Sequence, residues 1–348
     1  MDPTARPAGP TLDQDVVGSA ISCSLMVRYA IASVVVFGLA VAVIAQVPVW
    51  GRCGGNGWTA GYRKETQADG HGRPTVEATG DSYTQSGFNM SLAKPNPQNP
   101  LGNPPVPGWT SSGGLNWAGF LVTQLNASVV YSYNLASGGA TTDRALVAPS
   151  MSTALDLVDQ VAFFKDTVGK RPAWVPWTAE DTLVGVWMGA NDVGIAFNEP
   201  EDRVPPLLDK VVGSYFNQLQ ILHDAGLRNF VLLGVPPTQK TPLQLANSPK
   251  ARAALAEAGR LYSDLVVRGL ASFKAANADL SVAVFVDTAA PFNEALDHPT
   301  AYGAPNATCV NDNGFSCLWY DTYHPATQIH RLVALAVAKA VGRPWFTL

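Results

Sequence analysis

Residues 182–193 read TLVGVWMGANDV, a short apolar run followed at once by glycine, asparagine and aspartate. Apolar side chains at successive positions, rather than at alternate ones, are expected of a strand that is covered on both faces. Strands of this kind form parallel sheets with helices on each side. The stretch therefore predicts an α/β fold, with a buried strand over Thr182–Met188 and polar residues just past its end.

The same pattern continues along the chain. Three further strands are predicted at Val129–Tyr133, Phe230–Val235 and Val282–Val286, and helices at about residues 147–168, 205–225, 249–276 and 325–341. Alternating strands and helices predict a three-layer α/β/α sandwich around a parallel sheet, in one domain over residues 80–348. Ligands of such sheets bind beyond the carboxyl ends of the strands, so the polar motifs that follow each strand are the candidates for chemistry.

Composition narrows the classes of partner. A hydrophobic content of 47% is enough for a large core, while a net charge of -4 with 14% charged residues offers no basic surface for nucleic acid. We therefore expect a small or neutral ligand and no nucleic acid.

The first 79 residues differ from the rest. In residues 26–45 one arginine precedes a continuous apolar run that ends in small residues, which is the layout of a signal peptide. The alternative, a transmembrane anchor, needs about 20 apolar residues, and Tyr29–Ala45 is shorter, so we expect secretion and no stable membrane anchor. Residues 1–25 match no targeting pattern; one hypothesis is that they are an upstream extension of the gene model and that translation begins at Met26.

Cysteines and sequons fit a secretory route. Of the four cysteines, Cys23 precedes the apolar run, and Cys309 and Cys317 are the natural disulfide pair in an oxidising compartment, which leaves Cys53 unpaired. Three sequons are candidate glycosylation sites: Asn89, Asn126 and Asn306.

Two motifs supply a candidate nucleophile and its base. GDSYTQSGF, residues 80–88, places Ser82 at an expected strand-to-helix turn, although Gly-Asp-Ser alone is equally typical of a turn or an N-cap. DTYHP, residues 321–325, places Asp321 three residues before His324, close enough to fix the imidazole tautomer while the other nitrogen takes the serine proton. Of the other histidines, His71 lies in the atypical segment before Gly80, and three lack a comparable carboxylate and turn context: His223, His298 and His330.

Two further motifs offer hydrogen-bond donors to a substrate oxygen. NLASGGATTD, residues 134–143, follows a predicted strand, and either Gly138 or Gly139 can bring a backbone amide close to a ligand. Asn191 follows the strand that ends at Met188, and its side-chain amide is a neutral donor suited to a developing oxyanion. Taken singly, each motif is also typical of an ordinary turn.

The order GDS, NxAxGGAT, GxND and DxxHP resembles the four conserved blocks of the SGNH/GDSL hydrolase family over roughly residues 80–345. The resemblance implies Ser82, Asp321 and His324 as a catalytic triad. It also implies Gly139, or Gly138 if the alignment shifts by one, and Asn191 as oxyanion donors together with the Ser82 amide. It also implies that no metal or organic cofactor is needed.

Finer features resemble the fungal acetylesterases of carbohydrate esterase family 16. These are the GDSYTQSGF opening, the motif GVWMGANDV and the two-cysteine loop before LWYDTYHP. This resemblance implies removal of acetyl groups from acetylated sugars such as xylo-oligosaccharides. Trp187 and Trp319 lie beside the motifs and could stack on a sugar ring, or else pack in the core. Two alternative functions are compatible with the same sequence. One is a GDSL lipase or phospholipase for longer acyl chains, and the other is a cellulose- or wall-binding protein with an inactive hydrolase fold.

Residues 46–79 depart from the family pattern. QVPVWGRCGGNGWTA, residues 46–60, resembles the start of a fungal family 1 cellulose-binding module, which implies weak cellulose binding. The match then ends, without the later cysteines or a Ser/Thr/Pro-rich linker. We interpret the segment as a truncated remnant or as the result of a lost or misjoined exon. Nearer the chemistry, RPTVEAT precedes Gly80, and Glu77 in a central strand is unfavourable unless it reaches the strand end or finds a partner.

Overall fold

The computed structural model describes residues 74–175 and 177–348. In this part of the chain five strands form one parallel sheet in the order β2-β1-β3-β4-β5. In chain order the strands are β1 (Thr75–Gly80), β2 (Tyr131–Asn134), β3 (Thr182–Trp187), β4 (Asn229–Leu233) and β5 (Val282–Val286). The predicted parallel sheet is confirmed, and β1 is an inner strand of it, between β2 and β3.

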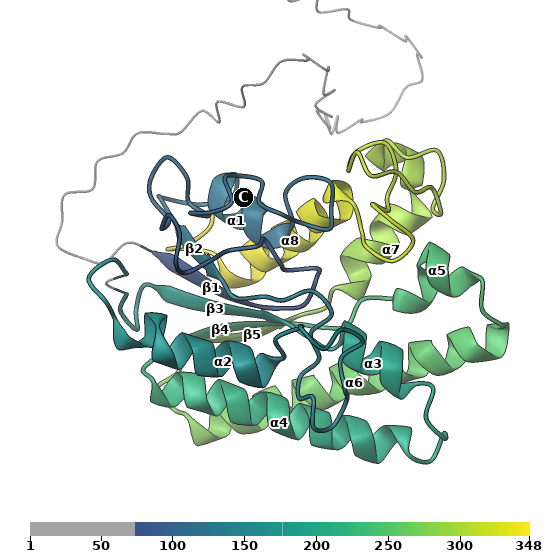
Figure 1. Cartoon of the computed structure of the whole chain (residues 1–348). Coiled ribbons are helices and arrows are strands. Elements are labelled where there is room, and N and C mark those ends of the chain that lie inside the picture. The colour runs from purple at the N-terminus through teal and green to yellow at the C-terminus, as the bar shows by residue number, and fades with distance from the viewer. Residues whose placement is uncertain (1–73, 176) are drawn as a thin grey trace, which may run out of the picture. The chain divides into compact units, whose positions relative to one another are not determined.

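Helices cover both faces of the sheet (Figure 1). One face carries α1 (Trp117–Thr123), α7 (Ala289–Asp297) and α8 (Thr327–Val341). The other carries α2 (Leu157–Asp166), α3 (Ala190–Ala196), α4 (Val204–Asp224) and α6 (Pro249–Ala276). A short α5 (Pro242–Leu245) and the 3-10 turns Val168–Lys170, Thr238–Lys240 and Pro299–Tyr302 lie in the connections. This is the predicted three-layer sandwich.

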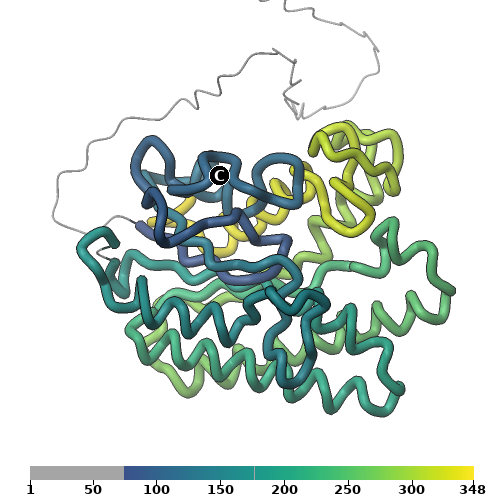
Figure 2. Tube along the Cα trace, in the orientation of Figure 1, coloured from purple at the N-terminus to yellow at the C-terminus, as the bar shows by residue number. Residues whose placement is uncertain are grey.

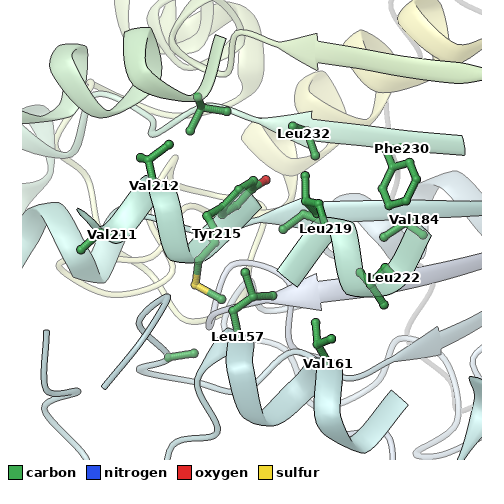
Figure 3. Packing of buried hydrophobic residues seen from close by; sticks show 14 of the residues in the cluster. Leu157, Val161, Val184, Val211, Val212, Tyr215, Leu219, Leu222, Phe230 and Leu232 are labelled. Atoms are coloured by element: carbon green, nitrogen blue, oxygen red, sulfur yellow. The ribbon is translucent and has the colours of Figure 1, made fainter. Parts of the chain in front are cut away.

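Each helical layer packs on the sheet through its own apolar core. Figure 3 shows the core below the sheet, where α4 packs against α2, β3 and β4 through Leu157, Val161, Val184, Val211, Val212, Tyr215, Leu219, Leu222, Phe230 and Leu232. On the opposite face, α1 and α8 lie side by side although they are far apart in sequence (Figure 2). The two cores bury both faces of the inner strands, which explains the apolar runs of β3 and β4.

Most helix predictions agree with the structure, and one needs correction. The helix predicted at residues 249–276 has these bounds, because Ser248 accepts a hydrogen bond from Ala251 N–H and Pro249 opens the first turn. By contrast, the helix predicted at 147–168 begins only at Leu157. Asp156 has an extended backbone, and its side chain caps the helix by accepting from Asp159 N–H, so residues 147–156 form a loop.

The strand expected before the GDS motif is β1, which begins at Thr75. The remainder of the predicted segment, residues 46–73, lies outside the described residues, as do the predicted signal peptide at 26–45 and the predicted extension at 1–25. Between residues 74 and 348, leaving aside Pro176, no helix combines the length and the apolar character needed to cross a membrane.

Glu77 occupies the middle of β1, opposite Tyr133 on β2 and Val184 on β3. The side chain is only 2% exposed, and within the described residues neither carboxyl oxygen has a hydrogen-bond partner. Burial raises the pKa of Glu77 well above its usual value, which favours the neutral acid. Glu77 therefore has neither access to solvent nor a hydrogen-bond partner, the two conditions under which the sequence made a glutamate acceptable here.

Candidate active site

Ser82 lies on a tight turn at the carboxyl end of β1. Gly80 ends the strand, and a Cβ there would lie 2.5 Å from the carbonyl oxygen of Trp187 on β3, so only glycine fits. Thr84 and Gln85 then donate their N–H groups to the carbonyl oxygen of Asp81 at 3.1 and 2.9 Å. The turn leaves the Ser82 side chain partly exposed while both of its neighbours are buried.

His324 and Asp321 reach Ser82 from the segment that precedes α8. His324 Nε2 lies 2.8 Å from Ser82 Oγ, and His324 Nδ1 lies 2.7 Å from Asp321 Oδ2. Asp321 Oδ1 also accepts the N–H groups of Tyr323 and His324, both at 2.8 Å. The fold thus joins Ser82, His324 and Asp321 in one chain of hydrogen bonds, across a sequence separation of 242 residues.

Asp321 remains an acceptor for His324 because its ionised form is stabilised. Burial acts to raise the pKa of Asp321, but the hydrogen bonds from the His324 ring and from the two backbone N–H groups outweigh it, and the pKa is lowered. A carboxylate on Nδ1 leaves Nε2 free to accept the Ser82 proton. This arrangement can activate a serine hydroxyl for attack on an ester carbonyl.

Donors for a developing oxyanion lie on the neighbouring loops. Gly139 follows β2 with a φ of +77°, and none of the described residues accepts a hydrogen bond from its N–H. The Gly138 N–H, in contrast, donates to Gln85 Oε1. Asn191, in the first turn of α3, donates from Nδ2 to the carbonyl oxygen of Ala140 at 2.8 Å, which leaves its second amide hydrogen available.

Residues 76–337 match the GDSL-like lipase/acylhydrolase family. The chain belongs to this family. A curated relative of this GDSL chain is the acetylesterase of Thermothelomyces thermophilus, which is 52% identical over 262 residues that cover 75% of this chain and 86% of the relative.

Solved structures similar to the GDSL chain include an acetylxylan esterase from Geobacillus stearothermophilus, with a TM-score of 0.45, 16% identity, and coverage of 79% of this chain and 98% of that chain. Another is an α/β hydrolase enzyme from the metagenome of Lake Arreo, Spain, with a TM-score of 0.41, 17% identity, and coverage of 77% and 95%.

The two tryptophans predicted to stack on a sugar lie in the core of the GDSL domain, and that prediction is wrong. Trp187 is 2% exposed and donates from Nε1 to the carbonyl oxygen of Gly234 at 2.9 Å. Trp319 is 0% exposed and donates to the carbonyl oxygen of Ala307 at 2.7 Å. Because α7 covers this side of the sheet and both rings pack against its Phe292, the alternative of core packing is correct.

The predicted disulfide between Cys309 and Cys317 is present. Of the three sequons, Asn89 and Asn306 are exposed. Asn126 is partly buried and donates from Nδ2 to the carbonyl oxygen of Ser128 at 2.6 Å. Glycosylation at these positions stays a prediction.

The other histidines are less isolated than the sequence suggested. His223 Nε2 lies 2.8 Å from Asp279, and His298 Nδ1 lies 3.6 Å from Glu294, so both have a carboxylate neighbour. His330, on α8, is buried without a hydrogen-bond partner among the described residues, and burial, together with nearby His324, lowers its pKa to about 3. His71 lies outside the described residues. Of the described histidines, His324 is the one that contacts both a carboxylate and a serine hydroxyl.

Sequence reasoning missed the groups that hold the Ser82 turn. Gln160, on α2, accepts from Gly80 N–H and donates to the Gly80 carbonyl oxygen, both at 2.9 Å. The Thr84 carbonyl oxygen accepts from Asn116 at 2.7 Å and from Asn134 at 2.6 Å. Asn134 begins the quoted NLASGG motif, but Gln160 and Asn116 belong to no such motif, so the sequence carried no signal for them.

Two buried aspartates tie the loops of the site together. Asp192 accepts the Thr142 N–H at 2.9 Å and its hydroxyl at 3.1 Å, and burial raises the pKa of Asp192 to about 7. Burial also raises the pKa of Asp81 to about 6, although the hydrogen bond from Tyr83 N–H acts to lower it.

Across the described residues, no cluster of three or more His, Cys, Asp and Glu side chains could hold a metal ion.

Proposed function

We propose that this protein is a secreted serine esterase that removes acetyl groups from acetylated carbohydrates such as xylo-oligosaccharides, as the fungal acetylesterases of carbohydrate esterase family 16 do. The observation that carries the proposal is the hydrogen-bonded chain of Ser82, His324 and Asp321. The name of the Thermothelomyces thermophilus relative, acetylesterase, supports acetyl as the acyl group that is removed. The signal-peptide pattern of residues 26–45 supports secretion.

In the proposed reaction Ser82 Oγ attacks the acetyl carbonyl carbon while His324 Nε2 takes the hydroxyl proton. The oxyanion receives hydrogen bonds from the N–H groups of Ser82 and Gly139 and from Asn191 Nδ2. His324 then returns the proton to the sugar oxygen, the C–O bond breaks, and acetyl-Ser82 remains. Water activated by His324 attacks this ester in the same way, which releases acetate and restores the Ser82 hydroxyl. No metal or organic cofactor takes part.

The test is acetate release from acetylated xylo-oligosaccharides by wild type, Ser82→Ala and Asp321→Asn. Ser82→Ala removes the nucleophile and should abolish turnover. Asp321→Asn should lower kcat on the order of 10⁴-fold, because the imidazole then loses the acceptor that sets its tautomer.

Ser281→Ala is the matched control, since this exposed serine lies at the amino end of β5, away from the carboxyl ends of the strands, and should leave turnover unchanged. Equal acetate release by wild type and Ser82→Ala would overturn the mechanism. A series of p-nitrophenyl esters from acetate to palmitate tests the acyl group, and a preference for long chains would instead support a lipase.

A further inference from the structure

Trp109 exposes more of its side chain than any other aromatic residue in the described part of the chain. The residue is 72% exposed, and it lies on the long segment between β1 and α1. Scattered exposed apolar residues are normal on protein surfaces, so exposure by itself has no functional meaning. The exposure of Trp109 gains a functional meaning from the position of this residue relative to Ser82.

The segment that carries Trp109 is bound to the turn that carries Ser82. Trp109 N–H donates to the carbonyl oxygen of Ser86 at 2.8 Å. Two residues further on, Ser111 Oγ donates to the carbonyl oxygen of Ser82 itself at 2.7 Å. The segment around Trp109 is therefore attached to the turn of the nucleophile by two hydrogen bonds and is not a free loop.

The Trp109 ring also packs against the backbone at Gly87. A Cβ at Gly87 would lie 3.0 Å from Trp109 Cε3 and 3.2 Å from Trp109 Cβ, so the absence of a side chain there lets the indole lie against the backbone. One part of the ring is fixed by this contact while most of its surface faces solvent. A rigid aromatic surface loses little conformational entropy when it binds a ligand.

The chemistry around Trp109 favours a neutral ligand. Neither residues 82–89 nor residues 108–114 include a charged side chain. The nearby hydroxyls of Thr110 and Ser112 are used within the loop, where both donate to the carbonyl oxygen of Gly114. What remains for a ligand is the apolar face of the indole, and the C–H face of a pyranose ring is complementary to such a surface.

We propose that Trp109 is the sugar-binding platform of this esterase, on which a pyranose ring of the acetylated oligosaccharide stacks while its ester lies at Ser82. This inference rests on the proposed function and assigns to Trp109 the role that buried Trp187 and Trp319 cannot have. It predicts a selective contribution to sugar substrates, because an acyl ester without a sugar has no ring to stack.

The test compares kcat/KM for acetylated xylotriose and for p-nitrophenyl acetate in wild type, Trp109→Ala and Trp109→Phe. In Trp109→Ala, kcat/KM for the sugar ester should fall about tenfold more than kcat/KM for p-nitrophenyl acetate, chiefly through KM. Trp109→Phe keeps an aromatic face and should recover most of the loss. Trp174→Ala is the control, because this tryptophan is also exposed, at 38%, but lies on the segment that precedes β3.

A binding measurement separates this inference from the proposed function. In a Ser82→Ala background the acetylated oligosaccharide is not cleaved, and calorimetry should give a Kd about tenfold higher when Trp109→Ala is added. An unchanged Kd, or an equal fall of kcat/KM on both substrates, overturns the platform. If wild type fails to release acetate while binding still depends on Trp109, the proposed function is wrong and the platform stands.

Discussion

Glu77 places an ionisable side chain in the middle of a strand with a neighbour on each side, and burial raises its pKa. We predict that Glu77→Leu increases the free energy of unfolding at pH 7 by about 1–3 kcal/mol, because a buried polar group without a partner is removed. The folded pKa exceeds the unfolded value, so the protonated acid stabilises folding fully below about pH 4.5, and this stability is lost as pH rises through the folded pKa. The gain should therefore be smaller at pH 4 than at pH 7.

Urea unfolding of wild type and Glu77→Leu at both pH values measures this difference. Glu199→Leu serves as the control, since that glutamate is exposed and should give no pH-dependent change. A gain for Glu77→Leu that is the same at pH 4 and pH 7 would contradict the prediction.

At the scale of elements, the disulfide loop between α7 and α8 positions the segment that carries Asp321 and His324. Cys309 and Cys317 close it, and Asn311 N–H donates to the carbonyl oxygen of Trp319 at 2.9 Å. We predict that the double variant Cys309→Ala/Cys317→Ala loses roughly 2–3 kcal/mol of stability, the chain entropy expected for a loop of this length. Turnover should also fall, because the opened loop no longer holds His324 at hydrogen-bonding distance from Ser82.

Urea unfolding and p-nitrophenyl acetate hydrolysis, with and without a reducing agent, measure both effects. Reduction should destabilise wild type and leave the double variant unchanged. If the double variant were as stable as oxidised wild type, the loop would owe its order to its other contacts alone.

For the whole molecule, buried groups set the dependence of stability on pH. Burial raises the pKa of Asp81 to about 6 and of Asp192 to about 7, so both favour folding when protonated, fully below about pH 4 and progressively less as pH rises through these values. His330 acts in the opposite direction: burial lowers its pKa to about 3, so its contribution is complete above about pH 6.5 and is lost as pH falls toward 3.

The three acids Glu77, Asp81 and Asp192 make stability decrease as pH rises, and His330 alone makes it increase. We therefore predict that the free energy of unfolding decreases from about pH 5 to pH 8. The urea midpoint at constant m-value, measured across this range, checks the sign. A midpoint that rises toward pH 8 would show that these carboxyl groups are ionised in the folded protein.

Several features of this protein could be predicted from the sequence because short stretches encode them. The helix Pro249–Ala276 agrees with the predicted range, and its start coincides with a cap and a proline next to one another. The strand Val282–Val286 follows from its run of apolar residues. The order of the four motifs likewise indicated which serine, aspartate and histidine belong together. Hydrogen-bond caps and hydrophobic periodicity act over a few residues, so no partner from elsewhere in the chain is needed to recognise them.

The tertiary structure alone decided which side chains meet the solvent and which support the site. Trp187 ends β3, and Trp319 lies close to His324 in the sequence, yet both pack against Phe292 of α7 in the core. Trp109, in a segment without regular pattern, is exposed, and that segment is hydrogen-bonded to the turn that carries Ser82. Gln160 reaches Gly80 from 80 positions away, and Glu77 is buried because its strand lies inside a sheet whose two faces are covered by helices. Burial and long-range hydrogen bonds depend on how distant elements pack together, and for that physical reason the local sequence does not contain them.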